Sequence, residues 1–183
     1  IPVLCVFDSE EVGSVSPQGA GSSLLEDTLG RICDGLKLNR GRMLAQSFLV
    51  SADNAHAIHP NHPEYADPGN APVMGGGLVI KYNANLSYCT DSVSAAVFRK
   101  ICGRAGVKVQ TYHNRADLPG GSTLGRISLA HVSVPTVDIG LAQLAMHSCY
   151  ETAAVSDAVD LEKAMAAYYG STLEATESGF SIL

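Results

Sequence analysis

Apolar residues in this chain gather in short continuous runs that alternate with sets spaced three and four residues apart. The runs predict strands and the spaced sets predict helices. Strands are expected over residues 1–7, 47–51, 78–82, 107–112 and 132–139. Helices are expected over residues 24–35, 91–104 and 157–169. This alternation favours a three-layer α/β sandwich, in which helices flank a mostly parallel central sheet.

Glycine, proline and serine residues mark the connections between these elements. Ser22 or Ser23 is a suitable N-cap for the first helix, which Gly35 is expected to end. Pro135 interrupts the strand at 132–139, so we expect that strand at a sheet edge or with a bulge. Residues 54–72 carry four prolines and three histidines and are expected to form one long ordered loop. The glycine-rich turn at 119–123 is expected to lead into a helix or helical turn.

The first eleven residues join the most apolar run to a cluster of acids. Residues 1–7 have the length and composition of a central strand that is buried on both faces. Asp8, Glu10 and Glu11 follow at its carboxyl end, where open α/β sheets bind ligands. A central strand rarely opens a chain, and no initiator Met is present. We therefore expect a processed chain or a fragment.

A second predicted strand also ends near an acid, Asp53, and His147 follows the last predicted strand. Carboxylates together with an imidazole suit zinc, manganese or cobalt. Taken alone, an acidic turn is more often a solvated loop, and a single histidine is more often a packed or surface residue. The spacing of these residues leaves open whether they converge on one site.

Composition and charge restrict the class of protein. The chain has 183 residues, of which 46% are apolar and 16% are charged, as in a globular domain. A net charge of −6 without a Lys/Arg run argues against a general nucleic-acid binder. No apolar stretch is long enough for a membrane span, and no signal peptide is recognisable. Five cysteines without a Cys-x-x-Cys pair favour reduced thiols in the cytoplasm.

Five sequence blocks, in order, closely resemble the aspartyl aminopeptidase family, whose members are cytosolic dinuclear-zinc enzymes. The blocks are FDSEEVGSVSPQGAGS at 7–22, SADNAHAIHPN at 51–61, GGGLVIKYNANLSY at 75–88, DLPGGSTLGRI at 117–127 and VDIGLAQLAMHSCYE at 137–151. The resemblance implies a zinc-exopeptidase-like fold and a homo-oligomer. It also implies removal of the N-terminal residue from peptides, with a preference for Asp or Glu at that end.

The resemblance implies roles for seven residues, which all lie in these blocks. Glu10 resembles the general base that activates a metal-bound water. Glu11 and His147 resemble ligands of one metal, and Asp53 resembles the carboxylate ligand of a second metal. Two divalent ions are implied, with zinc first and manganese or cobalt as alternatives. The residues that match the substrate pocket are His56, Lys81 and Tyr88.

Two departures from the family pattern change what is expected of this chain. The family's early histidine, its bridging aspartate and its lid and dimerisation domain precede the Glu-Glu motif, and none of them is within residues 1–183. We therefore interpret the chain as the C-terminal portion of one catalytic domain, which needs the missing N-terminal segment as a partner. Leu86 and Ser87 stand where many members carry Gln-Arg, which puts the acidic preference in doubt.

Two other classes of function stay open. The glycine-rich turn at 119–123 could cradle an anion, but the Gly-Lys-Ser/Thr of a nucleotide-binding P-loop is absent. The chain could also be a non-enzymatic fragment or an assembly subunit that works only with its missing half. The intact set of Glu10, Glu11, Asp53 and His147 argues against a degenerate enzyme.

Overall fold

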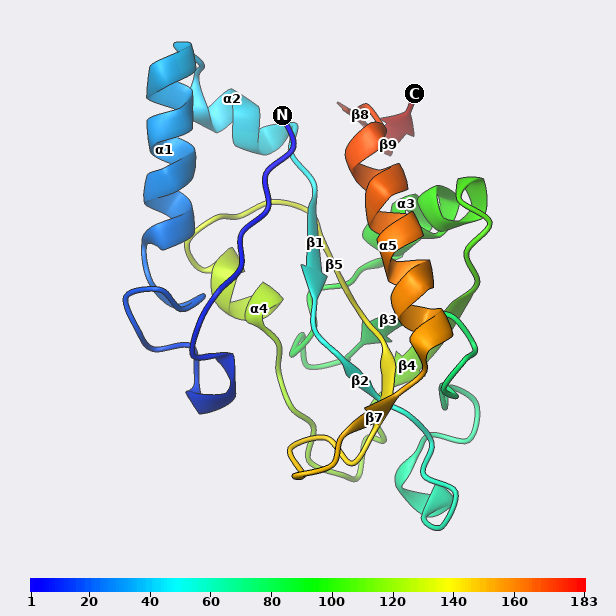
Figure 1. The fold of residues 1–183 in the computed structure, drawn as a ribbon. Helices are drawn as coiled ribbons and strands as arrows, with labels where there is room; N and C mark the ends of the chain where they lie inside the picture. Colours follow the sequence, from blue (N-terminus) through cyan, green and yellow to red (C-terminus); the bar gives the residue numbers. More distant parts are fainter.

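A four-stranded sheet with strand order β1-β5-β3-β4 forms the centre of the computed structural model, which describes residues 1–183 (Figure 1). The strands are β1 (Leu49–Ala52), β3 (Leu78–Tyr82), β4 (Val109–His113) and β5 (Thr136–Gly140). β1 is parallel to β5 and β3 is parallel to β4, whereas β3 and β5 are antiparallel. The sheet is therefore mostly parallel, as the alternating pattern predicts.

A second, smaller sheet continues the central one. Its strands, in the order β2-β6-β7, are β2 (Ala55–His56), β6 (Ala142–Leu144) and β7 (Thr152–Ala153). β2 follows β1 after two residues, and β6 follows β5 after one residue, so the chain passes from one sheet to the other at both places. Gly140 lies at this crossing, where a β-carbon would be 2.0 Å from the Asp53 carbonyl oxygen. Only glycine allows the two segments to approach this closely.

Helices cover both faces of the central sheet. α3 (Ser92–Arg104) and α5 (Val155–Gly170) pack together on one face (Figure 1). α4 (Leu124–Leu129) contacts β1 and β5 on the other face, and α1 (Leu24–Leu36) and α2 (Arg40–Ala45) lie beyond β1. Alternate residues of β5 point to opposite faces: Val137 and Ile139 join the apolar core, whereas Asp138 faces α4. The three-layer sandwich expected from the sequence is present.

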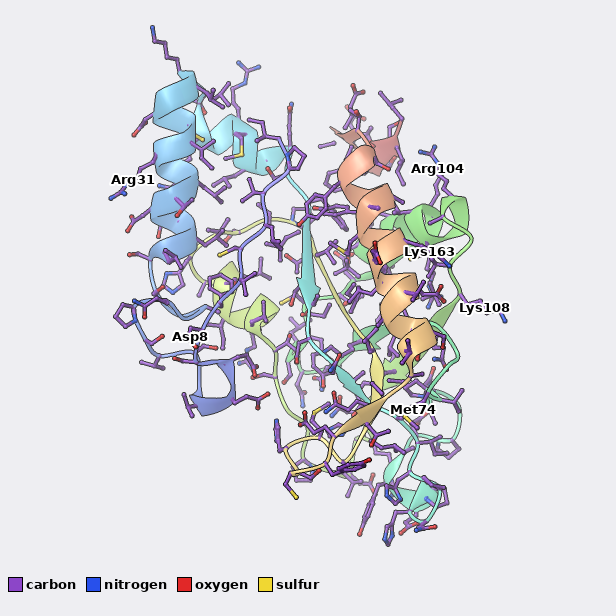
Figure 2. The ribbon with its side chains drawn as sticks, in the orientation of Figure 1. Asp8, Arg31, Met74, Arg104, Lys108 and Lys163 are labelled. Carbon is purple, nitrogen blue, oxygen red and sulfur yellow. The ribbon has the colours of Figure 1, made fainter.

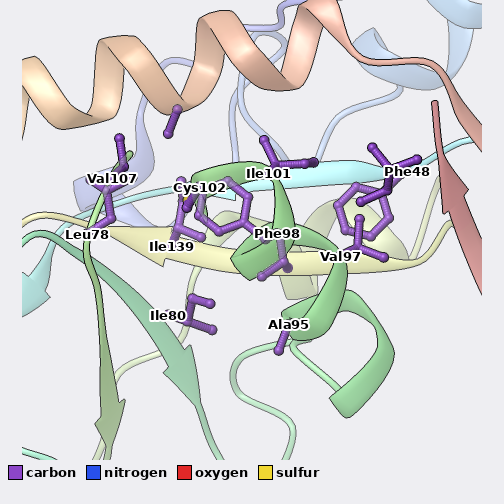
Figure 3. Close-up of a cluster of buried hydrophobic side chains, with 13 residues drawn as sticks. Phe48, Leu78, Ile80, Ala95, Val97, Phe98, Ile101, Cys102, Val107 and Ile139 are labelled. Atoms are coloured by element: carbon purple, nitrogen blue, oxygen red, sulfur yellow. The ribbon is translucent and has the colours of Figure 1, made fainter. Parts of the chain in front are cut away.

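The main hydrophobic core lies between the sheet and the α3–α5 pair (Figure 3). Thirteen buried side chains form it, including Leu78 and Ile80 of β3, Phe98 and Ile101 of α3, and Ile139 of β5. The predicted boundaries of β3 agree with the structure. Those of α3 differ by one residue, because Asp91 acts as its N-cap and accepts a hydrogen bond from the Ser94 backbone N–H.

The prediction of a central strand at residues 1–7 is wrong. This segment is extended but makes no backbone–backbone hydrogen bond, and it runs between α1 and β1 (Figure 1). Cys5 and Phe7 pack against a small cluster around Leu25, whereas Leu4 and Val6 are exposed. An apolar run becomes a buried strand only when neighbouring strands pair with it, and no described strand does so here.

The remaining differences concern shorter elements. β5 is a central strand with five buried residues, so the expected edge position is wrong. Pro135 is compatible with this position because it precedes the strand, where its carbonyl oxygen accepts from Leu49 N. The sequence pattern did not indicate α2, β2, the 3-10 turn η2 (Pro63–Tyr65) or the hairpin of β8 (Leu173–Thr176) and β9 (Gly179–Ile182). None of the helices combines the length and apolar character that crossing a bilayer requires.

Candidate metal centre

A cavity of about 360 Å³ opens where β1 and β5 pass into β2 and β6. All seven residues singled out in the sequence line it, although they come from four separate sequence blocks. They are Glu10, Glu11, Asp53, His56, Lys81, Tyr88 and His147. The chain thus brings the expected acids, imidazoles and lysine to one place. Glu151 and Gln143 also line the cavity and were not singled out from the sequence.

The two glutamates lie on a tight turn, the 3-10 helix η1 (Glu10–Val12). Ser9 and Gly13 flank the turn with φ values of 61° and 99°, and the Ser14 N–H donates to the Ser9 carbonyl oxygen at 2.7 Å. The Asp8 carboxylate accepts from the Ser9 N–H at 2.8 Å and does not line the cavity. This closed turn presents the consecutive side chains of Glu10 and Glu11 to the cavity.

Glu11 and His147 are in direct contact, with 2.7 Å between the Glu11 Oε2 and His147 Nε2 atoms. His147 has a φ of 67°, in the left-handed region that non-glycine residues seldom occupy. Its backbone N–H donates to Glu151 Oε1 at 2.6 Å. This hydrogen bond helps to hold the loop after β6 in the conformation that carries the imidazole to Glu11.

Lys81 anchors Asp53 from beneath the cavity. The Lys81 side chain is 1% exposed, and its Nζ donates to Asp53 O at 2.9 Å, Asn54 O at 3.1 Å and Asp53 Oδ2 at 3.3 Å. These bonds use the three N–H groups of an ammonium. The Tyr88 ring covers the same atom, with its centroid 5.0 Å away. The arrangement fixes the Asp53 carboxylate and leaves Lys81 no free N–H group for a substrate. Burial lowers the pKa of Lys81, and the negative charge of Asp53 opposes this shift.

The surroundings of the cavity shift the pKa values of Glu10, His56 and Tyr88. Burial raises the pKa of Glu10, and the negative charges of Asp53 and Glu11 raise it further. Burial lowers the pKa of His56, and the neighbouring His147 and Lys81 act in the same direction. Burial also raises the pKa of Tyr88, so its phenol stays protonated. A glutamate with a raised pKa is suited to accept a proton during a reaction.

A buried acid behind the cavity, Asp138, was also missed by the sequence analysis. Its carboxylate accepts from the Thr123 hydroxyl at 2.7 Å and from the Cys89 N–H at 2.5 Å. These two bonds hold the glycine-rich turn and the segment that follows Tyr88 against β5. The sequence did carry a signal for Asp138, which is a lone acid inside an apolar strand. A buried acid is costly unless it has hydrogen-bonding partners, so such a residue indicates a buried polar site.

The donor chemistry of Glu11 and His147 fits a zinc ion. Carboxylate oxygen and imidazole nitrogen are common zinc ligands, and a tetrahedral ion with bonds of about 2 Å separates two ligand atoms by about 3.3 Å. The pair therefore has to open only slightly from its 2.7 Å contact to hold such an ion. No group of three or more His, Cys, Asp or Glu side chains is arranged to hold a metal. Asp53, held by Lys81, is separate from the pair.

Comparison with known proteins identifies relatives of this chain. Residues 1–169 match the family model of the aminopeptidase I zinc metalloproteases, M18. A probable M18 family aminopeptidase 2 of Mycobacterium tuberculosis is 46% identical over 176 residues, which cover 94% of this chain and 41% of that protein. The chain thus spans about two fifths of the length of this curated relative.

Solved structures show the same fold. A cryo-EM structure of a complex of Ape4 and Nbr1 matches with a TM-score of 0.85 and 39% identity, over 89% of this chain and 31% of that chain. The mApe1 dodecamer of S. cerevisiae matches with a TM-score of 0.75 and 28% identity, over 89% of this chain and 37% of that chain. Because the family match extends over 169 of the 183 residues, this chain belongs to the M18 family of aminopeptidase I zinc metalloproteases.

Proposed function

We propose that this chain is part of a metal-dependent aminopeptidase that hydrolyses the N-terminal residue from peptides. The observation that carries the proposal is the convergence of Glu10, Glu11, Asp53 and His147 on one cavity. The 2.7 Å contact between Glu11 and His147 supports a metal position there. Family membership supports the same reaction class.

In the proposed reaction, each of these residues has a separate role. Glu11 and His147 hold one divalent ion and Asp53 takes part in holding a second, with zinc the first choice and manganese or cobalt as alternatives. Two such ions, when bound, activate a water molecule and polarise the scissile carbonyl group. Glu10 accepts the proton of that water and passes it to the leaving amine. The raised pKa of Glu10 supports this role.

The test of this assignment is Glu10→Gln in the zinc-loaded enzyme that contains this chain. We expect turnover to fall by about 10²–10⁴-fold, which is the usual contribution of a general base, while the metal content stays unchanged. Asp8→Asn is the matched control, because Asp8 is a neighbouring acid that does not line the cavity. Near-normal turnover of Glu10→Gln with its full metal content would contradict the role of Glu10.

We further propose that the enzyme prefers peptides with an acidic N-terminal residue. The support is that Lys81 is the one Lys or Arg that lines the cavity. Since its N–H groups already bind Asp53 and Asn54, Lys81 attracts an acidic side chain through its charge rather than by direct contact. His56 and Tyr88 line the same cavity and complete the proposed pocket.

Lys81→Met tests the preference. We expect kcat/KM for N-terminal Asp and Glu to fall more than kcat/KM for Leu and Ala. Lys163→Met, which removes an exposed lysine on α5, is the control and should leave both values unchanged. An equal loss of kcat/KM for all substrates would mean that Lys81 only positions Asp53. Leu86 and Ser87 would then be the first residues to test for an altered substrate preference.

We also propose that residues 1–183 are the C-terminal portion of one catalytic domain and need the N-terminal portion of the same enzyme. Residues 1–7 have exposed apolar side chains and make no backbone–backbone hydrogen bond, and both features support this proposal. They border an apolar cavity of about 720 Å³ between α1, α2 and β1. A ligand count supports it too, because a catalytic zinc ion normally has three protein ligands.

Residues 1–183 purified alone are therefore expected to be inactive and to bind at most one metal ion tightly. The assay adds zinc, manganese or cobalt and a peptide that begins with Asp or Glu. Strong aminopeptidase activity from this preparation would show that the ligand count is wrong. If the complete protein also lacks activity while it keeps its metal, the alternative of a non-enzymatic assembly subunit is favoured.

We propose a homo-oligomer in the cytoplasm as the working state of the enzyme. The dodecameric state of the S. cerevisiae relative supports oligomer formation. The five cysteines, which are all free thiols, support a reducing compartment. Light scattering coupled to size-exclusion chromatography measures the oligomer, and a monomeric mass at micromolar concentration would contradict this part of the proposal.

A further inference from the structure

One cavity residue without a role in the proposed reaction is Gln143 of β6. The residue is 5% exposed and lines the cavity together with His56, its register partner on β2. The Gln143 Oε1 atom accepts a hydrogen bond from Asn54 Nδ2. Asn54 follows Asp53 directly, so this pair of amides lies beside the proposed metal-binding carboxylate.

The orientation of both amides follows from one backbone group. The Leu141 N–H contacts the side chain of Asn54 at 3.3 Å, and a backbone N–H can only donate. The Asn54 atom at that position is therefore the oxygen, Oδ1, and its Nδ2 faces Gln143. Because Nδ2 is also a donor, the Gln143 atom that meets it is Oε1. The Gln143 Nε2 group, with two N–H donors, is thus directed away from Asn54.

The Gln143 Nε2 atom has no hydrogen-bond partner in the protein. The side-chain atoms that lack a partner and are sealed from solvent belong to Ser14, Ser16, Ser51, Asn114 and Ser128, and not to Gln143. Nε2 is therefore accessible, and the accessible space that Gln143 borders is the cavity. A residue that is almost fully buried keeps one amide donor pointed at the site where the substrate is expected.

We propose that Gln143 Nε2 donates a hydrogen bond to a backbone carbonyl oxygen of the bound peptide. This inference rests on the proposed peptidase function and names a group that recognises the substrate backbone. An uncharged N–H donor matches a carbonyl oxygen, whereas the Glu10, Glu11 and Glu151 carboxylates in the cavity are acceptors that suit an ammonium group. The Asn54 amide fixes the donor before the substrate arrives, which lowers the entropy cost of binding.

Three substitutions in the zinc-loaded enzyme test the donor. Gln143→Glu keeps the size and the acceptor for Asn54 but removes the donor. Gln143→Met removes the donor without adding charge. Asn54→Asp leaves residue 143 unchanged but replaces the N–H group that orients it. The amide of Gln143 is then expected to rotate, to donate to the new carboxylate at position 54, and to turn its oxygen to the cavity.

We expect each of the three variants to raise KM for peptide substrates by about 10-fold, as for the loss of one hydrogen bond in a buried site. The zinc content and kcat should stay within about 3-fold of the parent values. Gln46→Glu, which makes the same chemical change at an exposed position, is the matched control. Peptide affinity measured by calorimetry in a Glu10→Gln background, where turnover is blocked, should fall by the same factor.

Different outcomes separate this inference from the proposed function. A parent enzyme that neither binds nor hydrolyses peptides would refute the function itself. The role of Gln143 would be refuted if the parent enzyme is active and all three variants keep KM and peptide affinity within 2-fold of the parent values. A loss in Gln143→Met without a loss in Asn54→Asp would also refute it, because the residue would then only fill the cavity wall. Thermal unfolding of each variant verifies that it folds. If both Gln143 variants fail to fold, the KM and affinity of Asn54→Asp decide whether Gln143 acts as the donor.

Discussion

Two buried aspartates offer a sharp test of the hydrogen-bond arrangement, because they have the same exposure and different partners. Asp138 and Asp157 are both 0% exposed. Asp157, in the first turn of α5, accepts from Gly75 N at 2.8 Å and Gly77 N at 3.1 Å. Both of its partners are backbone N–H groups, which can only donate. Asp138 instead has one backbone partner and one hydroxyl, and a hydroxyl can donate or accept.

The substitution of Asp by Asn at these two positions should therefore have unequal effects. In Asp138→Asn, the new amide oxygen accepts from the backbone N–H and the new N–H donates to the hydroxyl. Both partners stay satisfied, and the loss of charge assistance should cost about 1–2 kcal/mol. In Asp157→Asn, one backbone N–H faces another N–H and loses its acceptor. An unsatisfied buried donor costs about 1–3 kcal/mol more, so we expect Asp157→Asn to be the more destabilising change by that amount.

The assay is equilibrium urea unfolding at pH 7, followed by far-ultraviolet circular dichroism and tyrosine fluorescence. Coincident transitions and equal m values allow the free energies of unfolding to be compared. Asp34→Asn on the exposed side of α1 is the control and should change the free energy by less than about 0.5 kcal/mol. Equal losses for Asp138→Asn and Asp157→Asn, or a larger loss for Asp138→Asn, would refute the reasoning.

Three further predictions concern packing, pH and metal binding. Gly125→Ala should lower the free energy of unfolding by about 1–3 kcal/mol, because its β-carbon would lie 2.5 Å from a buried carboxylate oxygen. Gly30→Ala in α1 has open space around the new β-carbon and should raise the free energy of unfolding by about 0.5–1 kcal/mol in the same urea unfolding assay. Burial raises the pKa of Cys102 from 9.0 to about 12, so the folded protein keeps a proton that the unfolded chain loses, and stability should fall as pH rises from 9 towards 12. Urea unfolding at several pH values should show a shallower fall in Cys102→Ala, and identical slopes would contradict this. Glu151→Ala should weaken zinc binding in a chelator competition assay by about 10-fold, because it removes the acceptor of the His147 N–H, while Glu151→Gln keeps an acceptor and most of the affinity.

Four basic side chains can be followed on the surface of the structure (Figure 2). Arg31, Arg104, Lys108 and Lys163 extend outward from the ribbon at separate places (Figure 2). Arg31, Arg104 and Lys163 belong to α1, α3 and α5, and Lys108 immediately precedes β4. That the chain is not a general nucleic-acid binder stays a prediction from its net charge of −6.

Several elements and the family of the chain can be read from the amino-acid sequence alone. The boundaries of β3 follow its continuous apolar run, and those of α3 follow its apolar spacing and its local hydrogen bonds. The predicted boundaries therefore agree with the structure for β3 and differ by one residue for α3. The five sequence blocks indicated the family to which the chain belongs, as the family match over residues 1–169 confirms. The roles of Glu10, Glu11, Asp53 and His147 stay predictions, although the structure brings these residues to one cavity.

Which groups are paired and which are free depends on contacts in the tertiary structure. Residues 1–7 have the composition of a buried strand, but strand burial depends on neighbours that are distant in sequence, and here one face stays exposed. β5 is central because two other strands pair with it, which a proline at its start cannot reveal. The engagement of Lys81 with Asp53 joins atoms that are 28 residues apart, and the orientation of Gln143 by Asn54 joins atoms that are 89 residues apart. Hydrogen-bond partners at such separations are set by packing in three dimensions, and residue spacing does not encode them.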